Sequence, residues 1–214
     1  AFICLCTAVL PMSVSAEENE ATGKVYYVSS SEGDDSNDGL SQKTPFQTLA
    51  RVSELELTAG DQLLFKCDDI WYGTVTLELS KGTKDNPILI SSYGKGERPS
   101  LRYYTGHVTE ACAENVMVLW NCNGVEINNL DVGWSNAGIR MEYNTVGNKY
   151  VRIENCHFHD IYGTTQKTNL AALSFSSAIY TRMTEEINAS DFEKDGYPLT
   201  DFYINRCTSY DGGA

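Results

Sequence analysis

Apolar residues in the second half of the chain recur with a spacing that neither a single strand nor a helix produces. Three segments carry the same pattern at relative positions 0, 2, 5 and 7, namely Val125, Ile127, Leu130 and Val132; Val151, Ile153, Cys156 and Phe158; and Phe202, Ile204, Cys207 and Ser209. A single strand would keep a period of two throughout. The extra residue therefore predicts two short strands that meet at a tight bend. Asn129 and Asn155 occupy this bend in two copies, and Asn tolerates the left-handed backbone of a sharp corner.

The separation of the copies along the chain predicts a solenoid. Ile127 and Ile153 lie 26 residues apart, and Ile153 and Ile204 lie 51 residues apart. Short strands that repeat in this way stack in parallel, about 4.8 Å apart, so that equivalent residues form inner ladders. A β-sandwich is the other fold that short strands allow, but it would not produce the recurring bend.

The longer interval has two explanations. We favour one coil that carries an extra loop of roughly 25 residues (51 minus 26), since the stretch 185–200 is polar. The alternative is a separate coil, because the same offsets are matched by Leu173, Phe175, Ala178 and Tyr180. Cys156 and Cys207 are expected to be reduced neighbours in the inner ladder, since parallel stacking places their Cβ atoms farther apart than a disulfide prefers.

One helix is predicted, over residues 45–55. Thr44 is a good N-cap and Pro45 suits the first helical position. Apolar side chains follow at helical spacing, namely Phe46, Leu49, Val52 and Leu55. Short β segments dominate the remainder of the chain after Gly60, so this helix is expected to cover the end of the first coil.

The N-terminal segment resembles part of a secretory signal peptide. The first charge is Glu17, and the apolar stretch 1–10 is shorter than the about 20 residues that span a bilayer. Small residues at Val14 and Ala16 suit a cleavage site. We therefore expect a partial signal peptide over 1–16, a polar leader over 17–23, and the N-terminal part of a repeat domain over 24–214, truncated at its C-terminus. The expected location is extracellular or at the cell surface.

The composition restricts the classes of partner and ligand that the protein is expected to bind. The 214 residues include 16 basic and 29 acidic side chains, giving a net charge of −13, and no basic stripe that would neutralise phosphates. Nucleic acid is thus not an expected partner. Five cysteines follow position 16, and none shows zinc-site spacing with another Cys or His, so no metal site is predicted. The acidic stretch 34–45 begins like an EF-hand but ends in Pro45 where a Glu is required.

The chain resembles a known structural family in the segments YYVSSSEGDDSNDG, TPFQTLARVSEL, AGDQLLFKCDDIWYGTVTL and VRIENCHFHD. These are similar to the secreted right-handed parallel β-helix proteins of the pectate-lyase-like superfold, over roughly residues 24–214. The resemblance implies an all-β, right-handed parallel β-helix with a short N-terminal capping helix. The superfold includes hydrolases, lyases, epimerases and non-catalytic surface proteins, so the resemblance does not assign one activity.

Candidate catalytic residues come from aligning the bends. Asp160 and Asp211 share a position just past the second strand, and His157 and His159 precede Asp160. Two acidic groups about one strand spacing apart could serve as the acid and the ionised carboxylate of a glycoside hydrolase, with His159 orienting them. Residues expected to bind substrate near the same edge are Trp134, Arg140, Tyr162 and Tyr210. An Asp before Gly, as in Asp211-Gly212, is also an ordinary turn residue.

Three functions remain open from the sequence. The leading one is a polysaccharide-active enzyme, a glycoside hydrolase that requires no cofactor. The second is a lyase acting on uronate polymers, which would use a basic residue and often bound calcium. The third is a non-catalytic carbohydrate-binding or surface protein. All three have a polysaccharide as partner and no membrane span, and the sequence does not indicate an oligomeric state.

Overall fold

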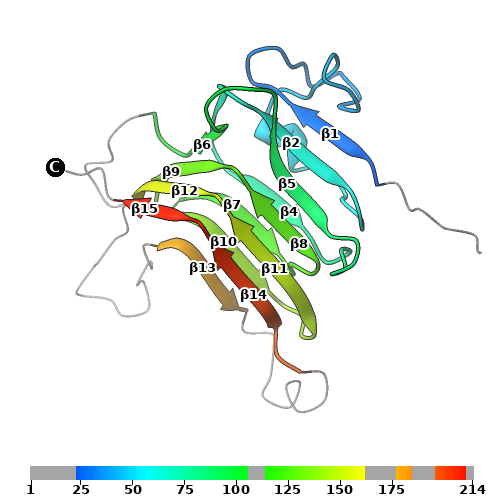
Figure 1. Ribbon diagram of the computed structural model, residues 1–214, viewed down its shortest axis with the longest axis vertical. Helices are drawn as coiled ribbons and strands as arrows, with labels where there is room; N and C mark the ends of the chain where they lie inside the picture. The colour runs from blue at the N-terminus through cyan, green and yellow to red at the C-terminus, as the bar shows by residue number, and fades with distance from the viewer. Residues whose placement is uncertain (1–22, 106–113, 162–176, 185–195, 211–214) are drawn as a thin grey trace, which may run out of the picture.

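The computed structural model describes residues 23–105, 114–161, 177–184 and 196–210. In this part of the chain three sheets wind around one core, and every strand pairing is parallel (Figure 1). Each complete coil contributes one strand to each sheet, so the fold is a right-handed parallel β-helix, as the repeat and the resemblance predicted.

Each sheet stacks strands from successive coils. In spatial order, the six-stranded sheet consists of β1 (Val25–Val28), β2 (Gln62–Lys66), β5 (Ile88–Tyr93), β8 (Val125–Asn128), β11 (Asn148–Glu154) and β14 (Leu199–Asn205). The five-stranded sheet consists of β15 (Thr208–Tyr210), β12 (His157–Ile161), β9 (Asp131–Ser135), β6 (Ser100–Arg102) and β3 (Ile70–Tyr72). The four-stranded sheet consists of β13 (Ser177–Met183), β10 (Ala137–Tyr143), β7 (Asn115–Trp120) and β4 (Val75–Glu78).

The core consists of stacked apolar ladders. In the six-stranded sheet, one ladder runs through equivalent positions of five strands: Leu63, Ile90, Ile127, Ile153 and Ile204. The first four of these side chains are buried, which removes a continuous apolar column from water. The expected stacking of Ile127, Ile153 and Ile204 is therefore confirmed.

The bends between the six-stranded and five-stranded sheets have the predicted backbone. Asn129 and Asn155 have φ values of 57° and 51°. Arg206 takes the equivalent place in the third copy with φ 51°. The left-handed corner is therefore a property of the repeat, and Asn is the residue that best tolerates it in two of the three coils.

The 51-residue interval is one coil. Ile153 lies directly opposite Ile204 in the β11–β14 pair, so no coil separates them. Ala178 and Tyr180 lie on β13, which pairs with β10 in the four-stranded sheet. The alternative of a separate coil is wrong, because this segment supplies the third strand of the coil that begins with β11. Leu173 and Phe175 lie outside the described residues.

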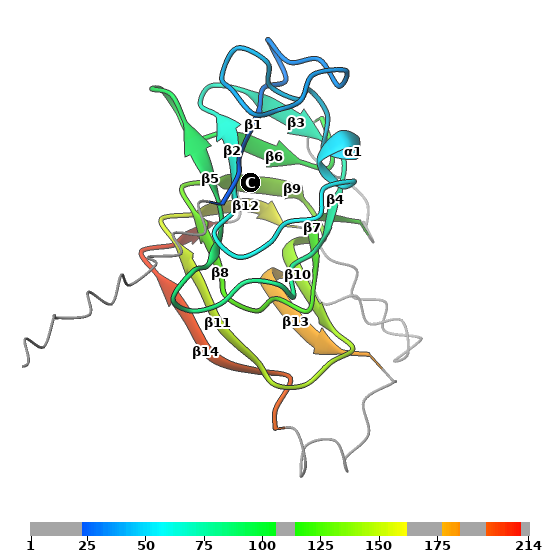
Figure 2. The same cartoon turned by 90° about the vertical axis from the view of Figure 1, so that its right-hand side faces the viewer.

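The capping helix exists but is shorter than predicted. Helix α1 spans Leu49–Val52, with Thr48 as its N-cap instead of Thr44 (Figure 2). The difference has a local cause, because Phe46 forms a parallel bridge with Val28 and is held in extended backbone. Leu49 and Val52 are buried in the same core as the ladders, so the helix covers the apolar interior as expected.

Two expectations concern the chain ends and the thiols. The signal-peptide segment 1–16 lies outside the described residues, as does most of the polar leader 17–23. Among the described residues, no helix is long and apolar enough to cross a membrane.

Cys156 and Cys207 are free thiols, which confirms the expectation that they are not joined.

Candidate functional site

The outer face of the five-stranded sheet carries a cluster of charged and aromatic side chains. At the start of β12 the residues alternate, so Phe158, like Cys156 just before the strand, is buried in the core, while His157 and His159 project from the other face. In the strand register, His157 lies opposite Asp131 of β9, and His159 lies opposite Gly133. The stacking of coils thus brings together groups that are 26 and 28 residues apart in sequence.

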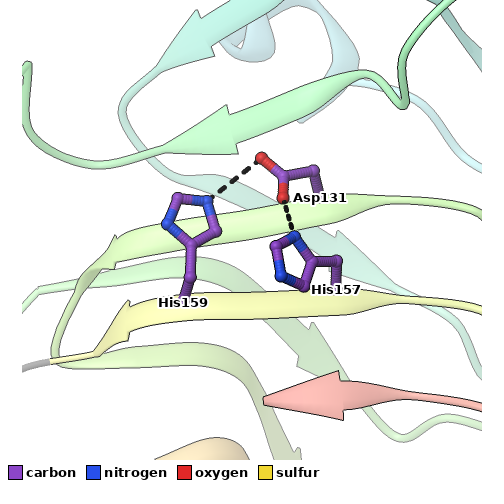
Figure 3. Close-up of side chains that lie close together, drawn as sticks. All are labelled: Asp131, His157 and His159. Atoms are coloured by element: carbon purple, nitrogen blue, oxygen red, sulfur yellow. Dashed lines mark hydrogen bonds and ion pairs between the residues drawn. The ribbon is translucent and has the colours of Figure 1, made fainter. Parts of the chain in front are cut away.

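Asp131 is the centre of this cluster (Figure 3). One carboxylate oxygen lies 2.7 Å from Nδ1 of His157, and the other lies 3.1 Å from Nε2 of His159. The second oxygen also accepts a hydrogen bond of 2.6 Å from the hydroxyl of Ser100, on the preceding coil. Three groups from two neighbouring strands, β6 and β12, therefore fix this one carboxylate.

The contacts shift the pKa values of the cluster in opposite directions. Burial by itself would raise the pKa of Asp131, but hydrogen bonds from His159 and Ser100 outweigh it and bring the pKa to about 2. The hydrogen bond to Asp131 raises the pKa of His159 above its ordinary value, against the opposing effect of burial. At neutral pH Asp131 is therefore ionised, and it is not a proton donor.

Asp160 is a buried residue that adjoins the cluster. It lies 2.7 Å from Nδ1 of His159, and only 7% of its side chain and 8% of the His159 side chain are exposed. The backbone of Asp160 has φ 50°, a left-handed conformation. Trp134, at the equivalent position of β9, has the same conformation. Asp160 is thus placed to hold the His159 ring, which in turn reaches Asp131.

A polar pocket of about 350 Å³ opens beside Asp131 and His157. Its walls come from the β3, β6, β9 and β12 coils and contain Asp68, Asp69, Ile70, Glu97, Arg98, Ser100, Arg102, Asp131 and His157. Asp131 and His157 keep 15% and 24% of their side chains exposed, so both can be reached from this pocket. Its four carboxylates and two guanidinium groups give a formal charge of −2 with His157 neutral.

The structure brings together some of the predicted site residues. The Tyr210 ring lies tilted against His157 and stacks on His159, with ring centroids 4.9 and 5.9 Å away. Trp134 meets the His159 ring edge-to-face at 6.3 Å, and the Arg102 guanidinium lies 5.7 Å from the centre of its ring. His159, Asp160, Trp134 and Tyr210 therefore form one neighbourhood.

Other predicted residues lie elsewhere. Arg140 is on β10 in the four-stranded sheet, where it forms an ion pair with the buried Glu142. Glu142 also pairs with Arg182 at 2.8 Å, so Arg140 belongs to a separate charged group on another sheet. Asp211 and Tyr162 lie outside the described residues, and the spacing of the Asp160–Asp211 pair is therefore not described.

Sequence reasoning missed Asp131, although the repeat contained the signal. The copy beginning at Val125 aligns Leu130 with Cys156, which aligns Asp131 with His157. Comparing outward positions between adjacent coils, instead of aspartates at the same register, would have found it. One coil earlier, Ser100 lies opposite Asp131 and Arg102 lies opposite Gly133. The segment that contains them does not show the 0, 2, 5, 7 spacing of apolar residues.

The fold and this site define a parallel β-helix protein with a charged pocket at the outer face of its five-stranded sheet. No protein-family profile matches the chain. A lacto-N-biosidase of Bifidobacterium longum subsp. longum is 33% identical over 107 residues, covering 44% of this chain and 6% of that protein.

Two solved structures share the fold. A GH136 lacto-N-biosidase from Eubacterium ramulus matches with a TM-score of 0.63 and 24% identity, over 86% of this chain and 34% of that one. A rhamnogalacturonan lyase matches with a TM-score of 0.54 and 18% identity, over 88% of this chain and 52% of that one. The chain thus spans only a small part to about half of the proteins that it matches.

Proposed function

We propose that the chain is part of a secreted carbohydrate-active enzyme, a glycoside hydrolase that binds its saccharide in the pocket beside Asp131. The observation that carries the proposal is the ionised Asp131 carboxylate, fixed by three groups in the wall of a polar pocket next to His157. Its volume of about 350 Å³ lies within the range of small-molecule sites. The sequence likeness to a lacto-N-biosidase supports the same class.

In the proposed reaction, Asp131 and His157 have different roles. Glycoside hydrolysis needs a proton donor for the leaving oxygen and negative charge that stabilises the cationic sugar ring. Asp131 cannot donate a proton at neutral pH because its pKa is about 2. His157 bonds Asp131 through Nδ1, which leaves its Nε2 to exchange a proton with the substrate. Asp131 holds the His157 ring in place through this contact, and Asp68 and Glu97 supply further negative charge in the pocket.

Asp160 has a positioning role in this proposal. It is buried and holds His159, which bonds Asp131, so it acts on the pocket only through two other residues. Tyr210 is 54% exposed and its ring contacts both imidazoles, which makes it the described aromatic residue best placed to contact a sugar ring.

The charge of the pocket favours a neutral saccharide. Four carboxylates against two arginines repel the uronate units on which a lyase of this superfold would act. Both arginines are also engaged, since Nε of Arg98 donates to Asn129 at 3.1 Å and Nε of Arg102 donates to Ser100 at 2.8 Å. A hydrolase of neutral sugars is therefore preferred over a uronate lyase.

The test is turnover of a saccharide panel by the complete gene product. Neutral and acidic oligosaccharides and polysaccharides are screened for release of reducing ends, and the best substrate is used for His157→Gln and Asp131→Asn. Removing a general acid–base group is expected to lower kcat by about 100-fold or more. The control Asp34→Asn changes an exposed carboxylate in the 29–45 loop and should keep wild-type turnover.

Three results would contradict the proposal. Turnover by both site variants within about threefold of wild type would show that the cluster is structural. Unsaturated products from acidic polymers would identify a lyase. Saccharide binding without turnover of any substrate would identify a non-catalytic protein.

A further inference from the structure

Three side chains on the five-stranded sheet present metal-binding atoms to one another. Nδ1 or Nε2 of His157 and His159 and a carboxylate oxygen of Asp131 all lie within 4.8 Å of one another (Figure 3). The two histidines are two residues apart on β12, so both project to the same side. Asp131 stands one coil away, directly opposite His157.

The donor set defines the class of ion. Imidazole nitrogen is a ligand for zinc and other divalent transition metals, whereas calcium and magnesium take oxygen ligands. Two imidazoles and one carboxylate also match zinc sites that keep a position open for water or a ligand. The alternation of β12 and the stacking of coils supply this set without any sequence motif of closely spaced ligands.

Asp160 orients one of these ligands. It lies 2.7 Å from Nδ1 of His159, so that Nε2 of the same ring points at Asp131. A metal-bound histidine usually holds its second nitrogen against a carboxylate or carbonyl in this manner, which fixes both the ring and its tautomer. Both partners are almost fully buried, and the ring is therefore held in place before any ion arrives.

Gly133 makes room for the same ring. A Cβ atom at this position would lie 2.9 Å from both Cε1 and Nε2 of His159 and 2.5 Å from the carbonyl oxygen of His159. Any side chain here would displace the imidazole. The absence of a side chain at position 133 is thus matched to the placement of His159 over β9.

The geometry points to a binding site for one divalent transition metal ion, of the zinc class, held by Asp131, His157 and His159 and supported by Asp160. An ion can enter through the pocket that Asp131 and His157 line, where Asp68, Asp69 and Glu97 add negative charge. The site shares Asp131 and His157 with the proposed hydrolase, but its test contains no saccharide, so failure of one proposal is distinguishable from failure of the other.

The experiment is calorimetric titration of zinc chloride into the untagged complete gene product, freed of metal with EDTA and dialysed. We expect one equivalent of zinc to bind to the wild-type protein. His157→Gln should weaken binding at least 100-fold. Asp160→Asn should weaken it about 10- to 100-fold, as loss of a supporting carboxylate does. The control Glu56→Gln removes an exposed carboxylate that pairs with Lys81 and not with the proposed ligands, and it should bind as wild type does.

Several outcomes would overturn the inference. These are no zinc binding by the wild-type protein, unchanged binding by His157→Gln, and calcium binding that is lost in the same variants. His157 is the most exposed of the three ligands, so its variant is expected to fold, and circular dichroism verifies this. If Asp160→Asn does not fold, the His157→Gln result decides the question alone.

Discussion

Asp69 ties the N-terminal loop to the first coil through a charged network that a single substitution can weaken. Its carboxylate accepts hydrogen bonds of 2.7 Å from the Ser29 hydroxyl and 2.6 Å from the Ser31 hydroxyl, and a longer one of 3.3 Å from the Ser31 backbone. The residue is 6% exposed. Burial raises its pKa, but the hydrogen bonds from Ser31 and Ser29 outweigh this effect, and the pKa lies below its ordinary value.

The expected cost of Asp69→Asn follows from these contacts. A hydrogen bond to a charged group contributes about 1.5–3 kcal/mol and one between neutral groups about 0.5–1.5 kcal/mol, so each of the two short bonds loses about 1 kcal/mol. The variant should thus lose about 2 kcal/mol in its free energy of unfolding at pH 7. For a protein of this size, that corresponds to a fall in Tm of about 4–8 °C.

The stability lost in Asp69→Asn should also depend on pH. A carboxylate whose folded pKa is depressed stabilises the protein above its unfolded pKa of about 3.9, and this contribution is lost as the pH falls through the folded value. The difference between wild type and Asp69→Asn should therefore be constant from about pH 5 to 7 and shrink below about pH 4.

Urea unfolding followed by circular dichroism measures both effects. Asp34→Asn is the matched control, because Asp34 also accepts two hydrogen bonds, both from Ser36, but lies exposed in a loop. If Asp69→Asn and Asp34→Asn unfold at the same urea concentration at pH 7, the network does not stabilise the fold. A deficit that stays undiminished at pH 3 would show that the charge is not its cause.

Two further predictions concern the repeat itself. Burial raises the pKa of Cys122 and Cys156 to about 12 each, so a thiol reagent at pH 8 should label both at least 100-fold more slowly in native protein than in urea, and equal rates would refute their burial. Asn155→Ala should cost about 2 kcal/mol, from left-handed strain and a lost 3.1 Å bond to Asn128, whereas Asn155→Gly loses only the bond. Thermal unfolding compares them, and equal Tm values would mean that the bend imposes no strain.

The fold could be predicted from the sequence because each coil repeats its apolar positions. The offset of Val125, Ile127, Leu130 and Val132 encodes both the inner ladder and the bend. The position of α1 could not be predicted as well, since Thr44 and Thr48 are both good N-caps. The choice between them depends on the contact of Phe46 with Val28, which are 18 residues apart.

The candidate site was only partly predictable for a related reason. His159 and Asp160 are adjacent in sequence, and their contact follows from local structure. Asp131 joins them only through the register of β9 and β12, and Ser100 only through that of β6 and β9. Predicting these contacts requires the register between strands of neighbouring coils, and the polar residues alone do not indicate that register.

In the proposed function, a saccharide binds beside Asp131 with His157 at the bond to be broken. The most direct measurement is a crystal structure of the complete Asp131→Asn gene product soaked with the best substrate from the panel. We expect a sugar in the pocket, with its glycosidic oxygen within about 3 Å of Nε2 of His157. A sugar bound on another sheet or coil, with this pocket left without saccharide, would contradict it.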